Sequence, residues 1–182
     1  MISALTFIIQ AFAQLYLLVL LLRLWLPWFR ADFRNPIAQA ILRLTSPLVV
    51  PVRRVIPPIG RLDTATVIVA IGIQYLTILV ILALHQASAG IAPIALTSVI
   101  DLAVLSIRLF IFAIIIGIVL SWIAPQTHNP ATAFIRAISE PLLRPFRRFI
   151  PPMGGIDISP VFAIILLGAL SVLLAELKPL PI

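Results

Sequence analysis

The sequence predicts an all-α membrane protein with four transmembrane helices in two parallel tandem repeats, each with amphipathic interfacial helices between its two spans. Of the 182 residues, 62% are hydrophobic and only 10% are charged, whereas roughly a quarter of a soluble domain is charged. Four apolar stretches reach the length of about 20 residues that crosses a bilayer. A Pro/Arg-rich stretch also occurs twice, which indicates an internal duplication.

The duplicated stretch reads PLVVPVRRVIPPIGRLD from Pro47 to Asp63 and PLLRPFRRFIPPMGGID from Pro141 to Asp157. Matching residues are displaced by 94 positions without a gap, and 14 of the 36 positions from Trp28 to Asp63 are identical in the second copy. The chain therefore divides into repeat one (1–84), an external linker (85–97) and repeat two (98–182).

The first predicted span, Ser3 to Trp28, is almost wholly apolar. Tryptophan is typical of the membrane interface, and Arg23, one or two turns inside the end of the span, is expected to snorkel back to that interface. After the span, Asn35-Pro36 is a helix-start signal. Apolar residues at helical spacing follow until Ser46-Pro47, where we expect the helix to stop.

A second short helix is predicted from Pro51 to the Pro57-Pro58 pair, followed by the second span, Thr64 to Leu84. In the other half, Ser98 to Ile123 is the third span. Another amphipathic helix starts at Asn129-Pro130, and the fourth span runs from Ser159 to about Leu177.

The distribution of basic residues predicts the topology. Short basic loops stay in the cytoplasm, so we expect a bacterial inner-membrane protein with both repeat loops cytoplasmic and both termini outside. The halves then run parallel, with a pseudo-twofold axis along the membrane normal. The two repeat loops hold 10 of the 13 basic residues: Arg30, Arg34, Arg43, Arg53, Arg54, Arg61, Arg136, Arg144, Arg147 and Arg148.

The repeated stretch places apolar residues three or four apart and an arginine pair on the other face, which describes a helix lying in the membrane interface. One interpretation is a connector that only fixes the angle between two spans. The other is a docking surface for a cytoplasmic or membrane protein, or for anionic phospholipid held by the arginines. Nucleic acid is disfavoured because the arginines alternate with apolar side chains. The residues concerned are Arg53, Arg54, Arg147, Arg148 and Arg144.

The glycine and aspartate that end each copy are predicted to be structural. Gly60 and Gly154 allow a tight turn. Asp63 and Asp157 precede spans, which suits helix N-caps, and each could also pair with the arginines of its own loop. One carboxylate per loop with no histidine nearby provides too few ligands for a metal.

Polar residues inside the spans form a second candidate site, made up of Gln14, Gln74, Asp101 and Arg108. Gln14 and Arg108 occupy equivalent positions in the two halves. An arginine near the bilayer centre costs roughly 2.5–3.5 kcal/mol. Arg108 could pair with Asp101 on the same helical face while the glutamines join helices. These residues could instead line a permeation or ion site.

The residue inventory indicates that the chain is not an enzyme and needs no cofactor. There is no cysteine, which excludes disulfides, thiol catalysis and cysteine-based metal sites. No nucleophile lies in register with a base, and no glycine-rich phosphate loop or zinc motif occurs. His85 and His128, each alone in a loop, are weak candidates for haem ligation.

The chain resembles the YggT family of small bacterial membrane proteins. The resemblance lies in LLLRLWLPW at Leu20–Trp28, RNP at Arg34–Pro36 and both copies of Pro-x-Arg-Arg-x-Ile-Pro-Pro-x-Gly-x-x-Asp. It implies a duplicated inner-membrane protein with links to osmotic or ionic stress, cell division, cytochrome assembly or nucleoid organisation in different relatives. The two copies differ where Arg144 and Gly155 replace Val50 and Arg61, so the halves need not have identical roles.

We therefore expect a non-enzymatic inner-membrane scaffold or assembly factor whose paired cytoplasmic Pro/Arg helices dock a partner or anionic lipid, with a link to osmotic stress tolerance. The alternative is a small cation channel or transporter that uses the intramembrane polar residues. Four spans enclose little water, so this alternative also predicts a homo-oligomer.

Overall fold

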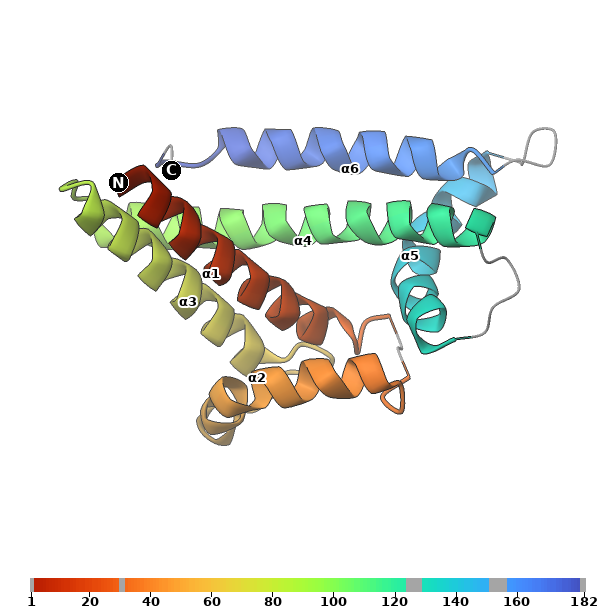
Figure 1. Ribbon diagram of the computed structural model, residues 1–182, viewed down its shortest axis with the longest axis horizontal. Helices are drawn as coiled ribbons and strands as arrows, with labels where there is room; N and C mark the ends of the chain where they lie inside the picture. The colour runs from red at the N-terminus through yellow and green to blue at the C-terminus, as the bar shows by residue number, and fades with distance from the viewer. Residues whose placement is uncertain (1, 30–31, 124–128, 151–156, 181–182) are drawn as a thin grey trace.

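The computed structural model of the chain describes residues 2–29, 32–123, 129–150 and 157–180 (Figure 1). In these ranges the regular elements are helices: α1 (Ile2–Trp25), α2 (Pro36–Val55), α3 (Thr64–Leu84), α4 (Ile91–Ile123), α5 (Pro130–Phe149) and α6 (Ser159–Glu176). Four of them, α1, α3, α4 and α6, are long and apolar enough to cross a membrane. The predicted all-helical fold with four spans is confirmed.

The two repeats are visible as two copies of one helical plan. α5 begins and ends 94 residues after α2, the same displacement that relates the two sequence copies. α1 and α4 both run away from the end of the molecule that holds the N- and C-termini (Figure 1), so the halves are parallel. Within each half the spans pack as antiparallel pairs, α1 with α3 and α4 with α6.

The predicted break at Ser46-Pro47 is wrong, because α2 is one helix that contains both Pro47 and Pro51. Proline removes a helical hydrogen bond and usually kinks or breaks a helix. Here Thr45 and Val49, on either side of Pro47, are fully buried. Both prolines lie on the exposed face, so the carbonyls that they leave unpaired are not buried. The helix therefore bends instead of ending, and α5 likewise contains Pro141 and Pro145.

The third span also differs from its prediction. α4 begins at Ile91, seven residues before the expected Ser98, so the second part of the predicted linker 85–97 is helical. Pro93 lies in the first turn of α4, where a backbone N–H would have no helical acceptor and proline is therefore tolerated.

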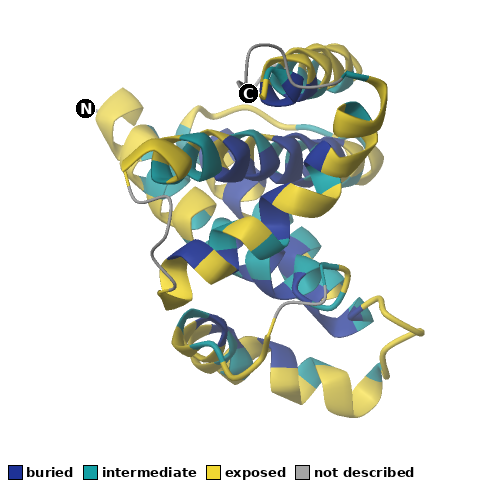
Figure 2. Cartoon of the chain, turned by 90° about the vertical axis from the view of Figure 1, so that its right-hand side faces the viewer, coloured by how far each residue is buried: buried dark blue, intermediate teal, exposed yellow. Residues whose placement is uncertain are grey.

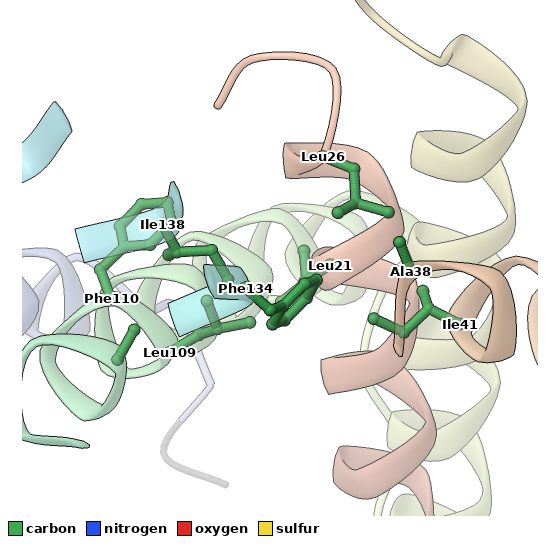
Figure 3. Close-up of a cluster of buried hydrophobic side chains, with 9 residues drawn as sticks. Leu21, Leu26, Ala38, Ile41, Leu109, Phe110, Phe134 and Ile138 are labelled. Carbon is green, nitrogen blue, oxygen red and sulfur yellow. The ribbon is translucent and has the colours of Figure 1, made fainter. Parts of the chain in front are cut away.

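The two repeats meet in one buried hydrophobic cluster, in the halves of α1 and α4 that lie away from the termini (Figure 1). Phe134 and Ile138 of α5 pack with Ala38 and Ile41 of α2 and with residues of α1 and α4 (Figure 3). The side-chain amide of Asn35 donates to the carbonyl of Pro130 at 2.7 Å. α2 and α5 therefore meet through their first halves, away from the end of the molecule that holds the termini (Figure 1).

The outer faces of the spans remain apolar. Phe7 and Phe12 of α1 are each 71% exposed, and α6 exposes Ile165, Leu166 and Leu173. Figure 2 shows the buried residues in the spaces where helices meet and the exposed ones on the outside. Exposed side chains of this kind suit contact with lipid, as expected for a multi-pass membrane protein.

Candidate functional site

The turn after α2 is built around Gly60. Ile59 and Leu62 exchange two backbone hydrogen bonds of 3.1 and 3.0 Å, which closes a tight turn. Gly60 has a φ of +60°, a conformation that glycine adopts without steric cost. This turn places Asp63 immediately before α3.

Asp63 is the centre of a buried polar network. It is the N-cap of α3, where its carboxylate accepts hydrogen bonds from the Thr66 hydroxyl at 2.6 Å and the Thr66 backbone N–H at 3.5 Å. The same carboxylate forms ion pairs with Arg53 and Arg23. Asp63 is only 6% exposed. Burial alone would raise its pKa, but the bonds from Thr66 and Arg53 outweigh burial and hold the pKa of Asp63 below its usual value.

Arg23 does not snorkel to the interface as expected. It is 4% exposed, and its guanidinium turns inward between α1 and α2. Arg23 Nε lies 3.5 Å from Asp63 Oδ2, and Arg23 Nη1 donates to Thr45 Oγ1 at 2.8 Å. The signal in the sequence was the cost of burying a charge, which requires a partner of opposite sign at the same depth. Asp63 is that partner.

The corresponding side chains of repeat two form a more exposed network. Arg147 Nε donates to Asp157 Oδ2 at 2.7 Å, and Arg147 Nη1 donates to Glu140 Oε1 at 2.6 Å. Asp157 accepts from the Ser159 backbone N–H at 3.0 Å, although the N-cap position of α6 is Ile158. Gly154 lies outside the described residues.

The charged side chains of this network in repeat two hold one another in their ionised forms. Burial would raise the pKa of Asp157, but the hydrogen bonds from Arg147 and Ser159 lower it overall. Burial would likewise lower the pKa of Arg147, but its bonds to Glu140 and Asp157 raise it overall. Arg147, in the last turn of α5, is therefore held as a cation between two carboxylates.

Each arginine pair is thus divided between two environments. Arg53 and Arg147 are bound to Asp63 and Asp157, the aspartates of their own repeats. The other candidate arginines are exposed and make no hydrogen bond or ion pair within the described ranges: Arg54, Arg144 and Arg148.

The polar residues predicted inside the spans are brought together around one cavity of about 300 Å³. It lies between α1, α3 and α4, and its polar lining consists of Gln10, Gln14, Gln74, Thr77, Asp101, Arg108 and Lys178. The 94-residue displacement explains why Gln14 and Arg108 face the same space, because equivalent positions in two parallel repeats lie on either side of the pseudo-twofold axis.

The pairing inside this cavity differs from the expected one. Asp101 accepts a hydrogen bond from Gln74 Nε2 at 2.8 Å and forms an ion pair with Lys178, which follows α6. Arg108 is exposed and has no ionic partner among the described residues. Lys178 was missed because it lies beyond the last span, and only the packing of α6 against α4 brings it to Asp101.

The chain is similar to a known protein family and to several proteins of that family. The CCB3/YggT family model matches twice, over residues 2–84 and 95–177. An uncharacterized protein of Pseudomonas aeruginosa is 42% identical over 173 residues, covering 94% of this chain and 88% of the relative. The uncharacterized protein YggT of Escherichia coli K12 is 34% identical over 175 residues, covering 96% and 90%.

A plant relative, the YlmG homolog protein 2 of Arabidopsis thaliana, is 37% identical over 59 residues, covering 31% of this chain and 22% of the relative. No solved structure matches the chain. The double match of the family model agrees with the two structural repeats described above. The chain belongs to the CCB3/YggT family.

Proposed function

We propose that this protein is a non-enzymatic scaffold or assembly factor of the bacterial inner membrane, and that α2 and α5 dock anionic lipid or a partner on their cytoplasmic side. The observation that supports this most is the division of each arginine pair. Arg53 and Arg147 are engaged by the aspartates of their own repeats, which leaves Arg54 and Arg148 as exposed guanidinium groups at equivalent positions.

The surroundings of these arginines suit an anionic lipid surface. Val55 follows Arg54 and Phe149 follows Arg148, and both apolar side chains are 81% exposed. A helix that presents cations beside exposed apolar residues can insert the apolar side chains while the cations reach phosphate groups. α2 and α5 contact each other through their first halves, and Arg54 and Arg148 lie in the last turns of these helices, so each repeat would act on its own patch of membrane.

The triple change Arg54→Ala, Arg144→Ala and Arg148→Ala tests this function. Each arginine near an anionic leaflet is worth about 1 kcal/mol, so the three changes are expected to weaken the preference for anionic over zwitterionic phospholipid roughly a hundredfold. The measurement is the lipid retained when the protein is extracted with its surrounding bilayer from vesicles of mixed composition. Arg108→Ala, which removes one cation at the polar cavity, is the control and should leave the preference unchanged.

An unchanged lipid preference in the triple variant would contradict lipid docking.

The charge of the polar cavity disfavours the alternative function, a cation channel, because the described lining holds two basic residues, Arg108 and Lys178, against one carboxylate, Asp101. Wild-type protein in vesicles is therefore expected to give no cation flux above empty vesicles. Flux that disappears in Arg108→Ala would replace the scaffold by a transporter.

The orientation in the membrane is a separate expectation. The natural sequence has no cysteine, so a single introduced one reports the side of the membrane without interference. Ser88→Cys, in the exposed link between α3 and α4, should react with an impermeant thiol reagent in intact cells. Gln39→Cys, exposed on α2, should react only after the cells are opened. The reverse pattern would invert the proposed topology.

A further inference from the structure

We propose that the cavity beside Gly117 in repeat two binds the guanidinium group of an arginine from a partner protein. The two repeats differ in this region, and binding there does not depend on lipid docking by the exposed arginines. The site lies where α4, α5 and the start of α6 meet, whereas Arg54 and Arg148 lie on the outer surface of their helices.

The repeats differ at one decisive position. The residue of repeat two that corresponds to Arg23 is Gly117, 94 positions later. In repeat one the Arg23 side chain fills the space between α1 and α2 and binds Thr45 and Asp63. In repeat two the corresponding helix is α4, and Gly117 has no side chain to fill the equivalent space between α4 and α5.

The residues that receive Arg23 have counterparts in repeat two. Ser139 corresponds to Thr45, and Asp157 corresponds to Asp63. A Cβ added at Gly117 would lie 3.3 Å from Ser139 Oγ, a close contact that requires a small shift of the serine and shows that its hydroxyl lies against Gly117. The binding groups are therefore present while the guanidinium is not.

A cavity of about 670 Å³ occupies this region. Gly117, Ser139, Glu140, Arg147 and Asp157 contribute to its lining, together with apolar side chains such as Val161. Such a mixed lining suits an arginine, whose three methylene groups need apolar contact and whose head needs acceptors.

Ser139 has an unused acceptor. It is 5% exposed, and its hydroxyl donates to the carbonyl of Ile135 at 2.9 Å. Thr45 makes the equivalent bond to the carbonyl of Ile41 at 2.7 Å and also accepts from Arg23. No donor reaches Ser139 Oγ from the described residues, so a buried oxygen faces the cavity with a lone pair available.

The balance of charge also favours an incoming cation. In repeat one a single carboxylate, Asp63, faces two guanidinium groups. In repeat two a single guanidinium, Arg147, faces two carboxylates, Asp157 and Glu140. Arg136 also lines the cavity, so repeat two has two carboxylates for two arginines. Repeat one has one carboxylate for two arginines.

Arginine fits these acceptors better than lysine. The Arg23 guanidinium reaches the hydroxyl with Nη1 and the carboxylate with Nε, and this use of two separate donors requires the planar fork that lysine lacks. Arg23 lies near the inner end of a transmembrane helix. An arginine at the cytoplasmic end of a partner's transmembrane helix would reach the cavity at the same depth.

The test uses n-propylguanidinium, which reproduces the arginine side chain, and follows the melting temperature (Tm) of the purified full-length protein in detergent. Wild-type Tm should rise saturably, by about 3–6 °C at ten times the dissociation constant. Gly117→Arg supplies the group covalently and should no longer respond. Arg23→Gly opens the same space in repeat one, should lower Tm, and should recover part of the loss when the compound is added.

An absent wild-type response, with clear recovery of Arg23→Gly, would overturn the site. A full response in Gly117→Arg, or an equal response to n-butylammonium, would also overturn it. Should Gly117→Arg fail to fold, Ser139→Ala takes its place, and a Tm response as strong as that of wild type would count against the proposal.

The partner protein is tested by crosslinking. A photo-crosslinker at Val161 should capture a peptide, and changing the arginine of that peptide to alanine should abolish crosslinking. No capture, or capture independent of arginine, would contradict a protein partner.

Discussion

Replacing Asp63 with alanine is expected to lower the free energy of unfolding by about 3–5 kcal/mol, because removing one partner of a buried ion pair leaves the other charge uncompensated. Arg23 is 4% exposed, and the change leaves its guanidinium in a membrane helix without a carboxylate. The same change removes the N-cap of α3 and releases Arg53. Equilibrium unfolding in detergent measures the loss.

Asp157→Ala is the matched control in repeat two. Asp157 is exposed, and Arg147 would keep Glu140 as a partner, so the expected loss is about 1 kcal/mol or less. The double change Arg23→Ala with Asp63→Ala should cost less than the sum of the single changes, because the two residues interact directly. Equal losses for Asp63→Ala and Asp157→Ala would contradict the buried network.

Replacing Phe134 with alanine is expected to cost about 3–5 kcal/mol, the usual range for a buried aromatic side chain. Phe134 of α5 is 6% exposed and packs in the cluster that joins α5 to α1, α2 and α4 (Figure 3). The change leaves a cavity at the point where the two repeats meet. Unfolding in detergent should show the lower stability, and proteolysis should become faster between the halves.

Phe149→Ala provides the comparison, since it is the same substitution in the same helix at a side chain that is 81% exposed. It is expected to change stability by less than about 0.5 kcal/mol. A Phe134→Ala variant as stable as Phe149→Ala would show that the cluster does not hold the repeats together.

The local sequence predicts much of this fold because the controlling signals are local. α3 begins and ends where predicted, at Thr64 and Leu84, since the capping Asp63 and the polar His85 frame one mostly apolar run. The duplication also places α2 and α5 in equivalent positions. The continuity of α2 could not be predicted in this way, because tertiary packing of Thr45 and Val49 outweighs the local effect of Pro47.

The candidate sites were only partly predictable for a related reason. The displacement of 94 residues brings Gln14 and Arg108 to one cavity, and the sequence contains that relation. The partners of the charges depend on contacts between distant segments: Arg23 and Asp63 are 40 residues apart, and Lys178 reaches Asp101 from beyond the last span. Neither pairing leaves a periodic pattern in the sequence.

The unequal lengths of α4 and α6 determine how the protein fits the bilayer. At 1.5 Å per residue, the 33 residues of α4 span about 50 Å and the 18 residues of α6 about 27 Å, against a hydrocarbon core of about 30 Å. α4 must tilt or extend past the core, while α6 falls slightly short of it. A span longer than the hydrocarbon core is accommodated by tilting or by locally thicker lipid, and a shorter span by locally thinner lipid. We therefore expect the lipid beside α6 to be thinner than the lipid beside the longer spans, even before any headgroup is bound.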